Sequence, residues 1–231
     1  QVMDRVMARY GIVVPDRQLA CAPLDSTEGR QYLGAMAAAS NFAWANRQAI
    51  TQAVRDAIAR VLGRSARGLG LDLVYDVSHN IAKLEDHEVD GRELRVLVHR
   101  KGATRAFPPG HADVPARYRD VGQPVLVPGD MGRCSFVAVG DHGSMRESFG
   151  STCHGAGREL SRHAALRKLR GVDVARQLAD QGITVRAQRP GLLAEEASIA
   201  YKDVAEVVRV AEAAGTIRRV ARLRPIIVVK G

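Results

Sequence analysis

Cysteine and aromatic residues are scarce in this chain, and each scarcity excludes a class of protein. Three cysteines, Cys21, Cys134 and Cys153, are too few and too scattered for a disulfide framework or a structural zinc site. We therefore expect free thiols that are buried by default. Aromatic residues make up 4% of the sequence, which argues against a platform that reads single strands by stacking on each base.

Long hydrophobic runs are also missing. The sequence has no stretch of about 18 consecutive apolar residues, no signal-peptide pattern and no lipidation motif. Nothing therefore places the chain in or across a membrane. Together with the few cysteines, this pattern predicts a cytoplasmic protein in a reducing compartment.

What the chain does have is enough apolar material for a core. It contains 231 residues, of which 46% are hydrophobic, with no internal repeat, low-complexity tract or long linker. These features predict one domain spanning residues 1–231. Apolar spacing predicts a mixed α+β fold. The expected helices are 1–10, one or two long helices over 26–62, 159–169, 173–181 and 204–214. The expected strands are 71–75, 94–98, 125–127, 135–139 and 225–229.

Positive charge is in excess, with a formal net charge of +9 and a pI near 10.0. Arginine carries most of it, and its guanidinium matches phosphate oxygens bidentately, so a polyanion such as RNA or DNA is the natural partner. The alternative is compositional, because a chain from a GC-rich genome uses arginine where others use lysine. Basic residues gather at 92–105, 158–170 and 209–224, and the first two clusters adjoin glycine-rich motifs.

One histidine stands directly against a glycine-rich turn. In Ser151-Thr-Cys-His-Gly-Ala-Gly-Arg158, His154 precedes Gly155 and Gly157, and helical spacing follows. Glycine lets the backbone approach a ligand, and a helix N-terminus favours an anion, so this histidine could hold a phosphate or accept one covalently. The alternative is a glycine-rich helix cap beside a histidine that only forms hydrogen bonds.

Other segments also suggest chemistry. His79 and Asn80 follow the expected strand 71–75, where a neutral imidazole would suit Zn²⁺ or Mn²⁺, although a histidine there can equally be a core residue. The basic turn 99–105 could bind phosphate, and the alternative is a hairpin exposed to solvent. The loop after 124–127 could form a phosphate nest or an ordinary tight turn. Lys230 ends the last expected strand and could reach a site or trail in solvent.

Together these segments resemble the RtcB-type RNA ligases, GTP- and manganese-dependent enzymes of tRNA splicing and RNA repair. The resemblance runs in order from near the start to the last residue. The motifs that carry it are Asn41-Phe-Ala-Trp-Ala-Asn-Arg-Gln48, Tyr75-Asp-Val-Ser-His-Asn80, His99-Arg-Lys-Gly-Ala-Thr-Arg105, Pro128-Gly-Asp-Met-Gly132, Ser151-Thr-Cys-His-Gly-Ala-Gly-Arg158, Ala200-Tyr-Lys-Asp203 and Leu223-Arg-Pro-Ile-Ile-Val-Val-Lys-Gly231.

The resemblance implies a ligase fold and a specific reaction. His154 would be the nucleophile that GTP guanylylates, and His79 would be a manganese ligand. The guanylate would pass to an RNA 3′-phosphate, after a 2′,3′-cyclic phosphate is opened where present, and a 5′-hydroxyl end would then expel GMP. The resemblance leaves open whether an archease-type activating partner is needed.

The resemblance also implies a guanylate pocket and an RNA contact surface. In the pocket, Tyr201 would stack on the purine, while Ser135 and Lys230 would hydrogen-bond the guanine edge. The pocket residues are His79, Asn80, Pro128, Gly129, Asp130, Met131, Ser135, His154, Gly155, Ala156, Gly157, Tyr201 and Lys230. The candidates for RNA phosphates are Lys101, Arg105, Arg158 and Arg162.

Two departures from the family pattern matter. The early D-x-G-C-G, G-x-G-N-H-F and H-T-G-S-R-G motifs, which carry the other metal ligands, do not occur in the sequence. We therefore expect the chain to correspond to the C-terminal half, with the N-terminal metal-binding part missing. Asp130 also stands where a small polar residue is more usual. The alternative function is a basic RNA-binding or assembly module that keeps the fold without catalysis.

Overall fold

The structure is a computed structural model that describes residues 2–170 and 172–230. It has helices and strands in an α+β arrangement, as the sequence predicts. Contacts between residues divide the chain into two compact units, residues 1–76 and 77–231. The expectation of a single domain stays a prediction, because two compact units can belong to one domain or to two.

The first unit is helical. Helix α1 spans Val2–Tyr10, a short 3₁₀ helix η1 spans Arg17–Leu19, and α2 is a 36-residue helix over Thr27–Leu62. The side chain of Ser26 caps α2 by accepting a hydrogen bond from the Gly29 amide, and Gly63 ends the helix in a left-handed conformation. The sequence left open one or two helices over 26–62, and the structure has one uninterrupted helix there. No described helix is both long enough and apolar enough to cross a membrane.

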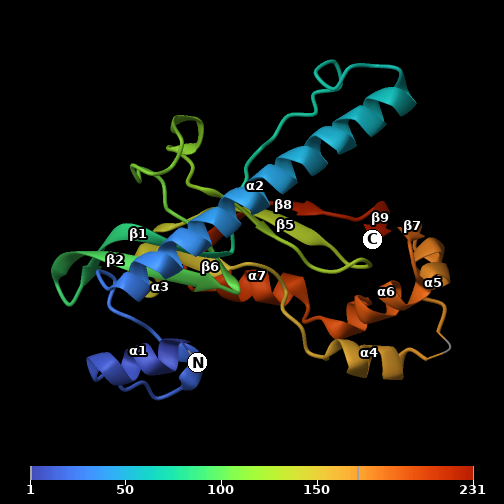
Figure 1. Cartoon of the computed structure of the whole chain (residues 1–231). Helices are drawn as coiled ribbons and strands as arrows, with labels where there is room; N and C mark the ends of the chain where they lie inside the picture. The colour runs from blue at the N-terminus through green and yellow to red at the C-terminus, as the bar shows by residue number, and fades with distance from the viewer. Residues whose placement is uncertain (1, 171, 231) are drawn as a thin grey trace. The chain divides into compact units, whose positions relative to one another are not determined.

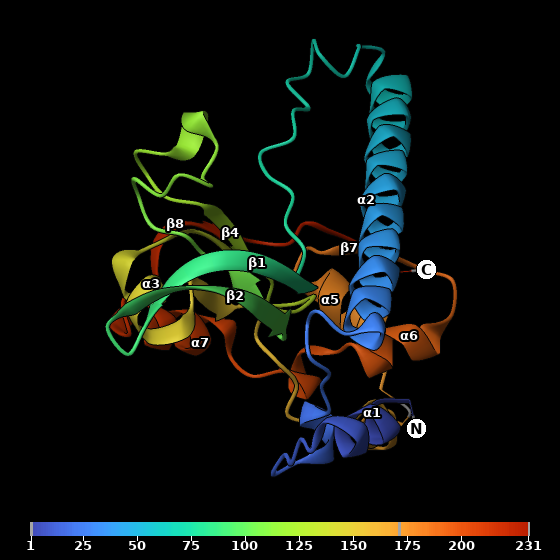
Figure 2. The ribbon, with the colours of Figure 1, turned by 60° about the vertical axis from the view of Figure 1, so that its left-hand side comes forward.

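The second unit contains the strands, which form small sheets (Figure 1). A long antiparallel ribbon pairs β1 (Asn80–Val89) with β2 (Arg92–Lys101), and Figure 2 shows its curvature. Strand β3 (Ala103–Arg105) pairs with β6 (Ser151–Cys153). A three-stranded sheet contains β4 (Pro124–Val127), β5 (Ser135–Gly140) and β8 (Ile217–Leu223). The parallel pair is β7 (Thr184–Ala187) and β9 (Ile227–Lys230).

Helices cover these sheets. They are α3 (His142–Ser148), α4 (Arg162–Lys168), α5 (Val174–Asp180), α6 (Pro190–Glu195) and α7 (Val204–Ala213), with 3₁₀ turns η2 (Ala116–Tyr118) and η3 (Ser198–Ala200). In Figure 1, α7 lies along the β5 and β8 sheet, while α4, α5 and α6 gather near β7 and β9.

The core has two parts. One lies between α7 and the three-stranded sheet, where Val204 and Val208 pack with Val125 and Phe136. The other joins α5 and α6 to β7, and it includes Leu178, Ile183 and Leu193. Burying such side chains supplies the main driving force for folding. Cys153 and Ala156, on either side of His154, pack in the first core, and Val228, two residues before Lys230, packs against the second.

Three expectations about secondary structure are wrong. Residues 71–75 form no strand, and the strand begins later, at Asn80, because 80–101 pair as a hairpin. The helix expected over 159–169 begins only at Arg162, where Ser161 supplies the cap. The last strand spans Ile227–Lys230 instead of 225–229. Gly231, the last residue of its motif, and Gln1 lie outside the described residues.

Candidate active site

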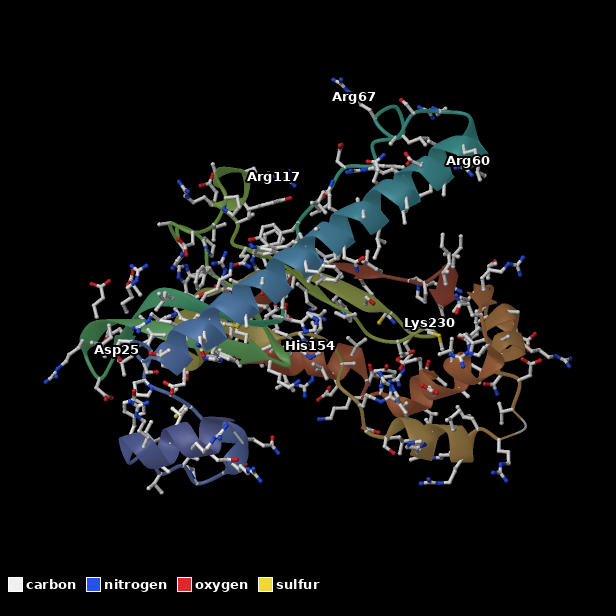
Figure 3. The ribbon with its side chains drawn as sticks, viewed as in Figure 1. Asp25, Arg60, Arg67, Arg117, His154 and Lys230 are labelled. Atoms are coloured by element: carbon white, nitrogen blue, oxygen red, sulfur yellow. The ribbon has the colours of Figure 1, made fainter. Side chains whose placement is uncertain are left out.

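Two histidines from distant parts of the chain meet in the second unit. His79 immediately precedes β1, and His154 immediately follows β6. Their ring centroids are 4.8 Å apart, with an angle of 35° between the ring planes. The sequence predicted both as site residues, and the structure brings them together. Figure 3 labels His154 within the second unit and Lys230 on β9.

Gly102 lies beside the His154 ring and links the two strand pairs. Its φ of +72° belongs to the left-handed region that glycine adopts readily. A Cβ placed on it would lie 3.6 Å from Nε2 of His154. The turn after β2 therefore runs directly past the imidazole, and it leads into β3, in which Ala103 pairs with Cys153.

The glycine-rich turn after His154 lies between two other predicted motifs. The Ala156 amide donates to the Pro128 carbonyl at 2.9 Å, and the Lys202 amide donates to the Gly157 carbonyl at 3.1 Å. Ala156 itself is buried in the core. However, α4 begins at Arg162, so the helix does not open at this turn. The prediction that its free N–H groups face an anion beside His154 is wrong.

The loop after β4 is filled by its own carboxylate. The Gly132 and Arg133 amides both donate to Oδ1 of Asp130, at 3.0 and 3.1 Å, and the Ser198 hydroxyl donates to the same oxygen. Nε of Arg133 lies 2.7 Å from Oδ2 of this side chain, which has no exposed surface. The amides expected to cradle phosphate therefore already bind an internal anion.

The neighbouring loop residues have packing roles. A Cβ on Gly129 would lie 1.9 Å from the Cys134 carbonyl oxygen, so only glycine fits there. The Gly129 amide donates to Oγ of Ser135 at 3.1 Å. Met131 is buried among the second core residues. Of this predicted stretch, Pro128 is exposed and Ser135 is half-buried, so these two present surface to a ligand.

Tyr201 lies in a network of charged groups. Its hydroxyl donates to Glu196 and accepts from Arg158 at 3.0 Å. The Arg158 guanidinium also lies over the tyrosine ring, 4.9 Å from its centroid. Burial and the bond to Glu196 raise the pKa of the Tyr201 hydroxyl. The phenol is therefore held neutral, with its ring fixed in orientation.

Lys230 ends β9, which pairs in parallel with β7 so that Lys230 stands opposite Ala187, and its positive charge acts on Glu196 of the same network. Burial alone would raise the pKa of the Glu196 carboxyl. The Tyr201 hydroxyl and the positive charges of Arg158 and Lys230 outweigh it and hold that pKa below its usual value. Lys230 is half-buried and does not trail in solvent.

The four candidates for RNA phosphates differ in availability. Lys101 is exposed and pairs with Asn80 at the open end of the β1–β2 hairpin. The Arg162 side chain is 70% exposed and lies 3.6 Å from Glu196. Arg105, in contrast, donates to Gln123 and pairs with Asp113, with a side chain only 14% exposed. Arg158 donates to three protein partners besides the tyrosine: Leu160, Glu195 and Glu196.

The metal-ligand set is incomplete within the described chain. No group of three or more His, Cys, Asp and Glu side chains that could hold an ion occurs among residues 2–170 and 172–230. Burial raises the pKa of the Cys153 thiol, which disfavours the thiolate that metals bind. The residues present therefore do not by themselves fit a manganese ion, since His79 is the one ligand that the sequence led us to expect.

Sequence reasoning missed three residues of this site. Glu196 accepts the Tyr201 hydroxyl bond, and Arg133 donates to the carbonyl oxygens of Ser198 and Tyr201, at 2.5 and 2.9 Å. Gly102 lies beside the His154 ring. The basic and acidic residues gave no local signal, because their partners lie far away in the sequence. The signal for Gly102 was its position inside the motif 99–105.

Comparison with known proteins agrees with these motifs. The family model described as tRNA-splicing ligase RtcB matches residues 1–231. Curated proteins of that name from Thermococcus kodakarensis and Archaeoglobus fulgidus are 56% and 57% identical over the whole chain, which covers 48% of each. One from Methanocaldococcus jannaschii is 50% identical, and the chain covers 24% of it.

The chain thus spans about half the length, or less, of the curated relatives that it matches. The match covers the whole chain, so the motifs that the sequence suggested, from 41–48 to 223–231, all lie within it. Because a family model covers the chain from its first residue to its last, this chain belongs to the RtcB family of tRNA-splicing ligases.

Proposed function

We propose that the second unit is the nucleotide-binding, nucleophile-bearing part of a GTP-dependent RNA ligase. The ligase would join an RNA 3′-phosphate or 2′,3′-cyclic phosphate end to a 5′-hydroxyl end, as in tRNA splicing or RNA repair. The observation that carries the proposal is the close approach of the His79 and His154 rings beside Gly102. Such a pair of imidazoles, with a glycine turn beside His154, suits phosphoryl transfer.

The proposed reaction has three displacement steps. A neutral nitrogen of His154 forms a bond to the α-phosphorus of GTP while the bond to the bridging oxygen breaks, and pyrophosphate leaves with the electron pair. An oxygen of the RNA 3′-phosphate then attacks this phosphorus and displaces the histidine. Finally, the 5′-hydroxyl oxygen of the second RNA attacks the activated RNA phosphorus, loses its proton and releases GMP.

The remaining pocket residues would bind the guanylate. The Tyr201 ring offers an aromatic face, and Ser135 and Lys230 offer hydrogen-bonding groups for the guanine edge. Lys101 and Arg162 are exposed and would contact RNA phosphates. Arg105 and Arg158 have internal partners, so they would help mainly by holding the pocket.

A manganese ion would neutralise the charge on the phosphoryl oxygens when bound. Within the described residues, the chain offers His79 as one expected ligand, and the rest would come from a metal-binding half of the ligase outside this sequence. An archease-type activator and a cytoplasmic location are further parts of this proposal, and RNA ends and GTP are its substrates.

The incomplete ligand set favours one second candidate. A basic chain with a net charge of +9 and no cluster of three metal ligands among its described residues could serve as an RNA-binding or assembly module without catalysis. The same experiment separates the two functions.

The experiment uses GTP labelled with radioactive phosphorus at the α position. The 231-residue chain, and the same chain extended upstream, are incubated with this GTP and Mn²⁺ and then separated by denaturing electrophoresis. We expect acid-labile label on the extended chain, because a phosphoramidate hydrolyses in acid. Absence of label from both chains would favour the RNA-binding module.

Two variants make the test specific. His154→Ala should abolish the adduct, and His163→Ala, which changes an exposed histidine on α4, should leave it intact. Lys230→Ala should weaken GTP use without removing the nucleophile. Label on the His154→Ala protein would contradict the assignment of the nucleophile.

A further inference from the structure

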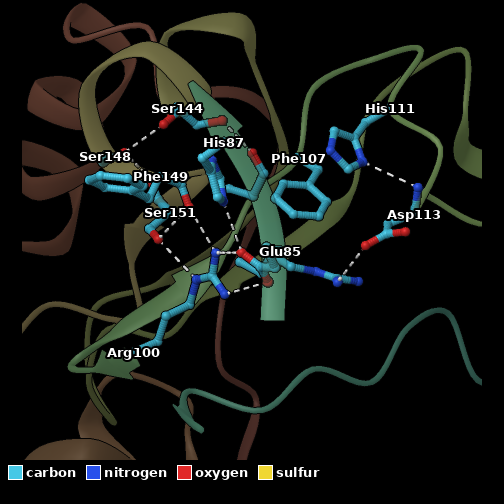
Figure 4. Close-up of polar contacts among 12 residues, drawn as sticks. Glu85, His87, Arg100, Phe107, His111, Asp113, Ser144, Ser148, Phe149 and Ser151 are labelled. Carbon is cyan, nitrogen blue, oxygen red and sulfur yellow. Dashed lines mark hydrogen bonds and ion pairs between the residues drawn. The ribbon is translucent and has the colours of Figure 1, made fainter. Parts of the chain in front are cut away.

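A buried polar cluster connects the β1–β2 ribbon with the start of β6. Nη1 and Nη2 of Arg100 donate to the two carboxylate oxygens of Glu85, at 2.8 and 2.7 Å. Nε of Arg100 donates to Oγ of Ser151 at 2.9 Å, and Nη2 donates to the Phe149 carbonyl at 2.8 Å (Figure 4). The Arg100 and Glu85 side chains are 1% and 2% exposed. A buried guanidinium with this many partners has one orientation.

This arginine joins two separate sheets. Arg100 and Glu85 lie on the β1–β2 ribbon, whereas Ser151 begins β6, which pairs with β3. Nε2 of His87, also on β1, lies 3.2 Å from the same carboxylate of Glu85. The ion pair therefore fixes the guanidinium from the ribbon side, and the guanidinium fixes the entry to β6.

The entry to β6 is a tight turn that needs such support. Phe149 and Gly150 have φ values of +51° and +62°, and this region is unfavourable for a phenylalanine. A Cβ on Gly150 would lie 2.4 Å from the Phe107 ring, so the backbone has no room on that side. The Arg100 bond to the Phe149 carbonyl holds the turn at this point.

Both halves of the candidate active site depend on this junction. On the β6 side, His154 follows Ser151 by three residues, at the end of a three-residue strand. On the ribbon side, Gly102 follows Arg100 by two residues, and Asn80, next to His79, pairs with Lys101. A shift of β6 against the ribbon would change the distance between the two imidazoles.

We propose that Arg100 is a positioning residue, which sets His154 of β6 against His79 and Gly102 of the ribbon through its bonds to Ser151 and Phe149. Its consequence for catalysis rests on the proposed function, while its consequence for geometry does not. A nucleophile displaced by about 1 Å can lose about 100-fold in rate.

The geometric test needs no ligand. Protons of the His79 and His154 rings, whose centroids are 4.8 Å apart, should give a nuclear Overhauser effect in the full chain. Arg100→Lys keeps a positive charge for Glu85 but cannot make all four bonds, so this signal should weaken. Ser151→Ala removes one bond, leaves the ion pair intact and should weaken it less. If Arg100→Lys fails to fold, the signal between the two rings in Ser151→Ala tests the proposal instead.

A matched control lies on the same ribbon. Arg95 pairs with Asp86 at 3.7 Å across β1 and β2, but these side chains are 67% and 57% exposed. Arg95→Lys should therefore leave the signal between the imidazoles unchanged. An unchanged signal in both Arg100→Lys and Ser151→Ala would overturn the proposal.

The kinetic test uses the chain extended upstream. Arg100→Lys should lower the maximum rate of GMP adduct formation by about 100-fold while the half-saturating GTP concentration changes less than about two-fold. A rate lowered only in proportion to the unfolded fraction would show a merely structural role. If no protein forms an adduct but the ring signal weakens as expected, the proposed function fails and the positioning role stands.

Discussion

Two polar networks flank the candidate active site, and they differ in burial. The Arg100–Glu85 network has side chains 1–2% exposed and joins two sheets. The network at Tyr201, in which Arg158 pairs with Glu196, has side chains 26% and 21% exposed and borders the predicted pocket. The buried network is suited to holding geometry, whereas the half-buried network is placed where a ligand can reach it.

This difference has an energetic meaning. Breaking a buried ion pair leaves an uncompensated charge in a medium that solvates it poorly, while water can replace a lost partner near the surface. Substitutions in the buried network should therefore affect folding most. Those at Tyr201 should affect nucleotide binding with a smaller cost in stability.

The largest effect is expected at Arg100. Arg100→Gln leaves Glu85 buried without its bidentate partner, so the free energy of unfolding of the second unit should fall by about 3–5 kcal/mol. Urea unfolding, followed by the amide signals of β2, would measure it. Arg95→Gln, which removes an exposed pair on the same strands, should cost less than about 1 kcal/mol. Equal losses of unfolding free energy in the two variants would contradict the difference between the buried and the exposed ion pair.

An intermediate effect is expected at Asp130. Asp130→Ala leaves the Gly132 and Arg133 amides without their acceptor and the Arg133 guanidinium without its ion-pair partner. The cost should be about 1.5–3 kcal/mol, since these bonds involve a charged group. Asp113→Ala, at an exposed partner of Arg105, serves as the control in the same unfolding measurement. A loss no larger than that of the control would show that the loop does not depend on its internal anion.

The pH dependence should come next in size. Burial would raise the pKa of Glu85, but the Arg100 guanidinium outweighs it and holds the folded-state pKa below the usual value of 4.5. Stability from this group is therefore complete above pH 4.5 and is lost as the pH falls through the lower folded value, by at most about 1.4 kcal/mol per pH unit. Glu85→Gln should flatten this decline in acid unfolding curves. An equally steep decline in that variant would assign the acid sensitivity to other carboxyls.

The smallest effect on stability is expected at Tyr201. Tyr201→Phe removes the hydroxyl that joins Glu196 and Arg158 but keeps the aromatic face. The free energy of unfolding should fall by about 0.5–1.5 kcal/mol. The half-saturating GTP concentration for adduct formation should rise less than in Tyr201→Ala. A Tyr201→Phe protein as impaired in GTP use as Tyr201→Ala would show that the network, not the ring, binds the nucleotide.

Local patterns predicted several elements well. The long α2 helix was visible because its alanine-rich sequence has no proline between Ser26 and Gly63. Strand β5 was visible as a short apolar run between glycines. Strand β1 was missed, since its polar and charged residues alternate only weakly with apolar ones, and its pairing with β2 determines its limits.

The sequence by itself determined the candidates for the site, because His79, His154, Tyr201 and Lys230 belong to motifs that resemble those of the family. It also determined the family. Only the tertiary structure decided which groups are available: Asp130 binds its own loop, Arg105 and Arg158 have internal partners, and Arg100 joins two sheets. The physical reason is that hydrogen bonds and ion pairs between residues far apart in the chain form only when folding brings them within about 3 Å.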